Sequence, residues 1–169
     1  SSCTSGGPPS GAPTTPTVGV QLTLPLGPRR AGTSFVVPVV AYSNGGELAS
    51  FDVSLTFDPA IFDNVSVAMS SLLADAVSNV QPDGTIKLVG LAAAGTHGPF
   101  ELAKVTLRLK SNLAPAAQGA IAGTIKDLLD PQNAPLVVTN TAVAGSGNVV
   151  VVANPVRGII ATPARTQLL

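Results

Sequence analysis

The sequence predicts an all-β domain, and three observations carry that prediction. The 169 residues include 17 Gly and 15 Pro, which interrupt the chain too often for long helices over most of it. In the clearest segments, apolar and polar residues alternate with a period of two. Clusters of turn-forming residues separate these segments at short intervals. About eight short strands at this spacing favour a sandwich or a barrel.

Two segments show the alternation most clearly. The first has four apolar positions, Phe51, Val53, Leu55 and Phe57, between the polar positions Ser50, Asp52, Ser54 and Thr56. The second has the apolar positions Ala103, Val105, Leu107 and Leu109 between the polar positions Lys104, Thr106, Arg108 and Lys110. Since successive side chains of a strand point to opposite sides, each strand should have one buried face and one solvated face.

The remaining elements are shorter. Strands are predicted at residues 18–24, 34–41, 86–91, 120–125, 136–139 and 148–152, with turn clusters at 43–46, 82–84 and 145–147. Pro25 and Pro38 lie in or beside strands, which predicts an edge or a bulge at each. Single helical turns that cap the sandwich are predicted at 58–62, 70–76 and 126–130, the first with Asp58 as its N-cap.

The first 17 residues differ in composition from the rest. Residues 1–17 consist almost wholly of Ser, Thr, Pro, Gly and Ala, so we expect an extended, disordered linker. A start at Ser1 rather than Met favours an exported protein whose signal has been removed. Cys3 is either a free thiol, which we favour, or a point of lipid attachment or intermolecular disulfide formation. Asn64, in Asn64-Val65-Ser66, is a candidate N-glycosylation site.

Residues 154–169 lie beyond the last predicted strand but keep apolar side chains, namely Val156, Ile159, Ile160, Leu168 and Leu169. An extended segment of this kind can add to an open sheet edge as an extra strand. If that edge belongs to a second copy, the contact runs head to tail and propagates into a filament. If it belongs to the same chain, the segment completes its own sandwich. Both interpretations stay open.

Composition excludes several classes of function. The nine basic and nine acidic residues give zero net charge, which offers nothing to attract nucleic acid or an anionic membrane. With one Cys and one His, the chain has neither an intramolecular disulfide nor a Cys/His metal cluster. No apolar run approaches the length of a membrane helix. His97 is predicted in a loop without a nucleophile or an orienting partner beside it, so we expect no enzymatic activity.

Two longer segments resemble the cohesin family. The first is Leu48-Ala49-Ser50-Phe51-Asp52-Val53-Ser54-Leu55-Thr56-Phe57-Asp58-Pro59-Ala60-Ile61-Phe62-Asp63-Asn64-Val65-Ser66-Val67, an alternating strand that ends in an aromatic-Asp-Pro turn. The second comprises Asp83-Gly84-Thr85-Ile86-Lys87-Leu88-Val89-Gly90 and Gly98-Pro99-Phe100-Glu101-Leu102-Ala103-Lys104-Val105-Thr106-Leu107-Arg108-Leu109-Lys110. The resemblance covers about residues 18–152 and implies a jelly-roll sandwich of about nine strands.

The resemblance also carries expectations about function. Cohesins are exported and non-catalytic, and the best known bind dockerin modules through one sheet face. By position, that face would include six outward residues, Asp52, Ser54, Lys87, Lys104, Thr106 and Arg108. Some cohesin-like modules carry calcium, so a calcium site stays open as an alternative. The spacing of Asp52, Asp58 and Asp63, or of Asp127 and Asp130, matches no calcium-binding motif, and we therefore expect no cofactor.

We therefore divide the chain into an extended tail (1–17), a β-sandwich (18–153) and an extension (154–169) that is a candidate donor strand. The function favoured by the sequence is that of a structural protein, extracellular or on the cell surface, whose extensions join copies of it into a filament or sheath. Its partners would then be copies of itself. The alternative is a protein-recognition module that binds a dockerin-like partner.

Overall fold

The computed structural model describes residues 18–138 and 140–153, and for residues 44–45 and 93–98 it describes the backbone only. Regular structure in this part of the chain is entirely β. Its strands are β2 (Val18–Leu22), β3 (Arg29–Arg30), β4 (Ser34–Phe57), β5 (Phe62–Met69), β6 (Leu73–Val80), β7 (Thr85–Leu109), β8 (Gln118–Leu129) and β9 (Gly147–Val152). Within the described ranges, no helix is long and apolar enough to cross a membrane.

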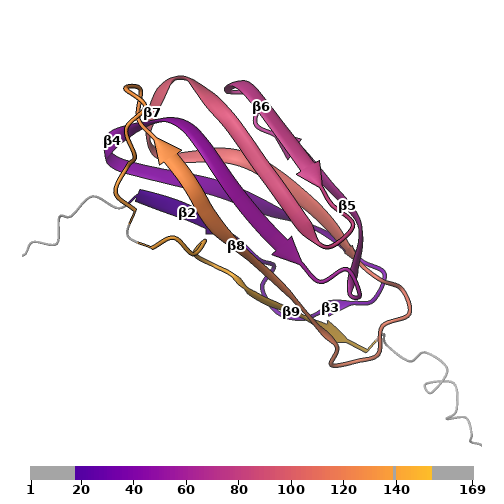
Figure 1. Cartoon of the computed structure of the whole chain (residues 1–169). Coiled ribbons are helices and arrows are strands. Elements are labelled where there is room, and N and C mark those ends of the chain that lie inside the picture. The colour runs from indigo at the N-terminus through magenta and orange to yellow at the C-terminus, as the bar shows by residue number, and fades with distance from the viewer. Residues whose placement is uncertain (1–17, 139, 154–169) are drawn as a thin grey trace, which may run out of the picture.

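The two longest strands, β4 and β7, determine the architecture because each contributes to both layers of a sandwich. They pair antiparallel, with residues 34–43 of β4 beside residues 98–108 of β7, and residues 48–56 beside residues 85–96. Both strands bend between these halves, at the same end of the molecule (Figure 1). The predicted turn at 43–46 lies at this bend, where the register shifts between Ser43 and Leu48 but the strand continues.

One layer contains β2, the first half of β4, the second half of β7, and β5. The other contains β6, the first half of β7, the second half of β4, β8 and β9. The short β3 runs parallel to the end of β9. Because β4 and β7 serve both layers, the eight described strands give ten strand segments, close to the nine expected. The predicted all-β sandwich is confirmed.

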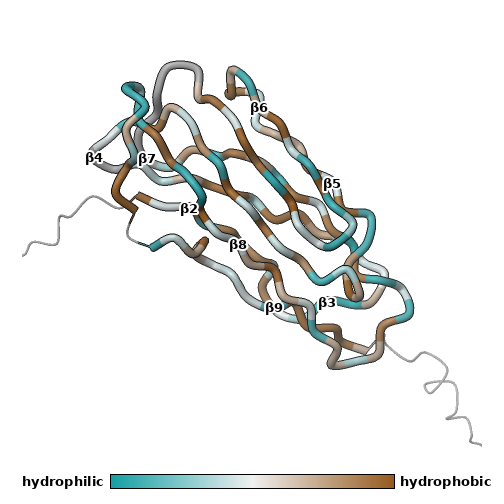
Figure 2. Tube along the Cα trace, in the orientation of Figure 1, coloured by the Kyte–Doolittle hydropathy of each residue, from teal (hydrophilic) through white to brown (hydrophobic). Residues whose placement is uncertain are grey.

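The core lies between the layers and follows the predicted alternation. Phe51, Val53 and Leu55 are buried on β4, and Val105 and Leu107 are buried on β7. Figure 2 shows hydrophobic and hydrophilic positions alternating along the long strands. One departure occurs where Leu102 and Ala103 are both buried, opposite the register shift between Val39 and Val40. This bulge adjoins Pro38, as the sequence predicted for a proline in a strand.

Two of the three predicted helical turns are wrong. Residues 73–76 and 126–129 belong to β6 and β8, because pairing with β7 and β4 outweighs the local preference of short segments. Residues 58–62 do form a tight turn, in which the Asp58 carboxylate accepts a hydrogen bond of 2.9 Å from the amide of Ala60. The predicted strand at 136–139 is also wrong over 136–138, where only an isolated bridge at Pro135 lies nearby.

The predicted turn at 82–84 is confirmed. Thr85 donates its amide hydrogen to the Asp83 carboxylate over 3.0 Å, and Gly84 donates to the carbonyl of Gln81 over 3.1 Å. Gly84 has a φ of +95°, and a β-carbon there would collide with the carbonyl oxygen of Phe57. This turn fixes where β7 begins and therefore which of its residues face outward beside β4.

Candidate functional site

The outer side of the layer that contains β6, β7, β4 and β8 forms a continuous surface, here called the β6–β8 face. Cross-strand register arranges its outward residues in rows that run from β6 to β8. The three central rows are Asp75–Leu91–Ser50–Leu129, Val77–Val89–Asp52–Asp127 and Asn79–Lys87–Ser54–Thr124. These rows bring together residues from four strands that are far apart in the sequence.

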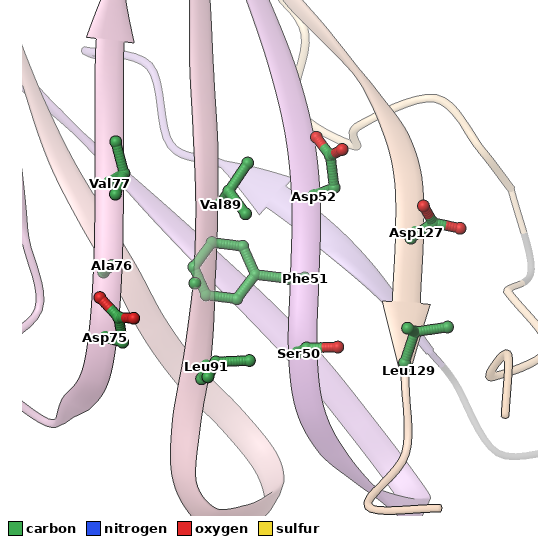
Figure 3. A pocket seen from close by; sticks show the side chains of 11 residues that line it. Ser50, Phe51, Asp52, Asp75, Ala76, Val77, Val89, Leu91, Asp127 and Leu129 are labelled. Atoms are coloured by element: carbon green, nitrogen blue, oxygen red, sulfur yellow. The ribbon is translucent and has the colours of Figure 1, made fainter. Parts of the chain in front are cut away.

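A shallow depression of about 310 Å³ lies over the first two rows. Its floor includes Phe51, Ala76 and Gly90, whose backbones belong to adjacent strands. Figure 3 shows the Phe51 ring reaching from β4 toward β7, where Gly90 has no side chain to oppose it. A β-carbon at Gly90 would lie only 2.8 Å from the ring. The floor is therefore a closely packed part of the core.

Apolar side chains stand exposed around this depression. Val77 is 63% exposed, Val89 is 45% exposed and Leu91 is 48% exposed. Val77 and Val89 are direct cross-strand partners, and Leu91 follows Val89 on the same side of β7. Single exposed apolar residues are ordinary, but adjacent ones on one side of a sheet form a patch that can bury area against a partner.

Three carboxylates surround the apolar patch. Asp52 and Asp127 are direct cross-strand partners, and Asp75 lies at the β6 side (Figure 3). None of the three belongs to an ion pair within the described residues. The lining of the depression includes no Lys or Arg, although Lys87 and Lys126 are exposed nearby. This part of the face therefore combines apolar contact area with negative charge.

The six residues that the sequence assigned to one partner-binding face lie in two layers. Asp52, Ser54 and Lys87 belong to the β6–β8 face. Lys104, Thr106 and Arg108 lie on the second half of β7, in the opposite layer beside β5 and the first half of β4. Alternation was right about which side chains point outward, but outward residues of opposite layers face away from each other.

Charges on that opposite layer are paired. Arg108 donates two hydrogen bonds of 2.8 Å to the two carboxylate oxygens of Asp63. The Arg108 guanidinium holds the pKa of Asp63 below its ordinary value, and the same hydrogen bonds raise the pKa of Arg108. Lys104 lies 3.0 Å from the carboxylate of Glu101. These side chains are held by their neighbours, which leaves less charge available to a partner.

Other candidate residues of the sequence are placed as follows. Asn64 is exposed on β5, with a φ of +51° at a register shift. His97 lies within β7 rather than in a loop, and only its backbone is described. Cys3, the linker 1–17 and the segment 154–169 with Val156, Ile159, Ile160, Leu168 and Leu169 lie outside the described residues, so the expectations for them stay predictions.

Three of the five carboxylates considered for calcium are engaged by other groups of the chain. Asp63 is paired with Arg108, Asp58 closes a turn, and Asp130 accepts hydrogen bonds from the amides of Gln132 and Ala134. In the described ranges, no three or more His, Cys, Asp or Glu side chains gather closely enough to hold a metal ion.

Fold and surface together define a class of protein, a two-layer β-sandwich with an open, partly apolar and acidic sheet face. The family follows from the sequence: the Cohesin domain family model matches residues 20–152. The chain belongs to the cohesin family, as its sequence predicted. A search of the curated proteins found no match.

Solved structures share this fold at low sequence identity. The sixth cohesin of scaffoldin B from Acetivibrio cellulolyticus, in complex with a mutant dockerin, matches with a TM-score of 0.61 and 19% identity over 82% of this chain and 99% of that one. An OlpA cohesin in complex with a dockerin from Clostridium thermocellum has a TM-score of 0.65 and 14% identity, covering 80% and 99%. The cohesin module of a family 33 glycoside hydrolase from Clostridium perfringens has a TM-score of 0.59 and 15% identity, covering 83% and 100%.

Proposed function

We propose that this chain is an exported, non-catalytic recognition module that binds a protein partner on its β6–β8 face. The observation that carries the proposal is the patch of Val77, Val89 and Leu91, which stand exposed on a sheet whose other side is already filled by the core. Burying such a patch against a partner is favourable by about 25 cal/mol for each Å² of apolar surface removed from water. The paired strands of the β-sheet provide the platform for that contact.

Electrostatics favours this face over the outer side of the opposite layer. There, Arg108 and Lys104 already have carboxylate partners, and a binding protein would have to desolvate both ion pairs. On the β6–β8 face, the carboxylates of Asp52, Asp75 and Asp127 have no cationic partner among the described residues. They are available to donors of an incoming protein, which gives orientation and specificity to apolar contact.

A dockerin-like protein is the partner class that we propose. Two of the similar structures are cohesins in complex with dockerins, and they share the fold of this chain over about four fifths of its length. The charge of the face adds a requirement of its own. The partner should present Lys or Arg beside apolar side chains, because the depression is lined by acids and aliphatic groups.

The test uses a display library of dockerin modules selected against the full chain, followed by calorimetry. Val89→Ser removes an exposed apolar side chain from the face, while Val36→Ser does the same in the opposite layer, where Val36 is 48% exposed against 45% for Val89. We expect selected modules to bind Val89→Ser about tenfold more weakly, a loss of about 1.4 kcal/mol, and to bind Val36→Ser normally. Modules that respond equally to both variants would refute the proposed face.

Self-assembly, which the sequence favoured, remains a second candidate function. The observation in its favour is that β6 pairs only with β7 within the described residues, which leaves an edge that an added strand can use. Deletion of residues 154–169 should then abolish large particles in light scattering of the pure protein. Particles of unchanged size would exclude that segment as the connector.

A further inference from the structure

The charges of the chain are unevenly divided between its folded part and the segment 154–169. All nine Asp and Glu residues lie within residues 18–153. Residues 154–169 contain Arg157 and Arg165 and no acidic residue. Each of these arginines precedes a pair of aliphatic residues, Ile159-Ile160 and Leu168-Leu169. The segment is therefore a cationic and apolar peptide attached to a sandwich that holds every acidic side chain.

The β6–β8 face has the complementary chemistry. Asp52, Asp75 and Asp127 line its depression, and the exposed Val77 and Leu91 lie between and beside them. Arginine forms planar, two-pronged hydrogen bonds with carboxylates, so two arginines spaced along a peptide suit acids that are spread over several strands. The aliphatic pairs of the segment supply side chains that the apolar patch can cover.

Strand direction decides between the face of the same chain and the face of a second copy. β9 is antiparallel to β8, with Gly147 beside Ile121 and Val150 beside Gln118. The chain therefore leaves β9 near the start of β8, heading away from Asp127. Asp127 lies nine residue steps along β8 from Gln118, a distance of about 30 Å at about 3.3 Å per step.

To reach its own face, the segment would have to reverse direction and cross that distance. The 16 residues of the segment span about 53 Å when fully extended, so much of their length would be used before any contact formed. The face of a second copy requires no reversal. The exit of the segment and the face lie toward opposite ends of β8, as required for a head-to-tail contact.

We propose that residues 154–169 of one copy bind the β6–β8 face of the next, with Arg157 and Arg165 on its carboxylates and the aliphatic pairs on its apolar patch. The inference rests on the proposed function, because the recognition of a dockerin-like partner and the binding of this segment use the same face. The partner that it adds is a second copy of the chain. The contact is heterologous and does not close, so copies assemble in series. A dockerin-like partner competes with the segment for the same surface.

A charge-swap experiment on the full chain tests this contact by sedimentation velocity at low salt. The face variant carries Asp75→Lys and Asp127→Lys, and the tail variant carries Arg157→Glu and Arg165→Glu. We expect the wild-type chain to form larger species as concentration rises and each variant alone to stay monomeric. An equimolar mixture of the two variants should assemble again, because lysines of one face then meet glutamates of the other tail.

The matched control is Glu47→Lys with Glu101→Lys, which changes net charge equally but outside the face. It should assemble like the wild type. If the face variant still assembles but the tail variant does not, the segment binds somewhere other than this face, for example at a sheet edge. That result would overturn the proposal. A wild-type chain that stays monomeric at every concentration would also overturn the proposal, because that is the result expected if the segment docks on the face of its own chain. Neither result affects the proposed function, which is decided by the dockerin selection.

Discussion

Gly90 gives the sharpest test of how the floor of the β6–β8 face is packed. A β-carbon added there would lie 2.8 Å from Cζ and 2.9 Å from Cε1 of Phe51, and 3.1 Å from Cβ of Ala76. Ordinary carbon contacts are about 3.5–4.0 Å, so the ring would have to move by roughly 0.7 Å. Phe51 is 2% exposed, so its ring is already packed on nearly all sides.

We therefore expect Gly90→Ala to destabilise the protein. Overpacking of a filled core costs about 1–3 kcal/mol, and replacing glycine within a strand recovers about 0.5–1 kcal/mol of backbone entropy. The expected net loss is about 1–2 kcal/mol in the free energy of unfolding. With a urea dependence of about 2 kcal/mol per M, the unfolding midpoint should fall by about 0.5–1 M.

A double-mutant cycle with Phe51→Leu separates this collision from other effects. Removing the ring takes away the atoms that the new methyl group would strike, so Gly90→Ala should cost little in the Phe51→Leu background. The expected coupling is about 1 kcal/mol or more, as for residues in contact. An unchanged midpoint for Gly90→Ala, or additivity of the two substitutions, would refute the packing argument.

Two further predictions concern charged pairs. Asp63→Asn should lower stability near neutral pH; because Arg108 holds the pKa of Asp63 below its unfolded value of about 3.9, this stabilisation is present above about pH 4 and is lost as the pH falls through the folded pKa. Urea unfolding of the wild-type chain and of Asp63→Asn at several pH values should show that the difference between their free energies of unfolding shrinks in acid. A difference that stays constant with pH would contradict the ion-pair explanation. Asp127→Asn relieves a like-charged cross-strand pair with Asp52 and should raise the free energy of unfolding by about 0.2–1 kcal/mol at low salt; a less stable variant would contradict it.

The sequence predicted those strands whose alternation is regular and missed those in which it is broken. The second halves of β4 and β7 keep one phase, with Phe51, Val53 and Leu107 all buried. β5 was not predicted, because the register shift at Asn64 changes which positions point inward. Phe62 points inward before the shift and Val65 points inward after it, so the alternation is broken. β6 lies at the edge of its layer and is largely exposed, so it shows little contrast between its two sides.

The candidate site could be predicted only in part, for a geometric reason. Alternation tells whether a side chain points in or out, but a sandwich has two outer faces, and Lys104 and Arg108 proved to lie on the other one. Asp127 joins Asp52 through pairing of strands that are 75 positions apart, which no local pattern reveals. One signal was present: Val89 and Leu91 are apolar at outward positions of a strand whose inward positions, Ile86 and Leu88, already fill the core.

The most direct test of recognition through the β6–β8 face is amide chemical-shift mapping of the labelled chain as a selected dockerin module is added. We expect the shifts to concentrate in residues 50–56, 73–79, 85–91 and 124–129, which form the face. Residues 34–40 and 101–108 of the opposite layer should be unaffected and serve as the internal reference. Shifts concentrated in those reference residues, with the face unchanged, would contradict the account.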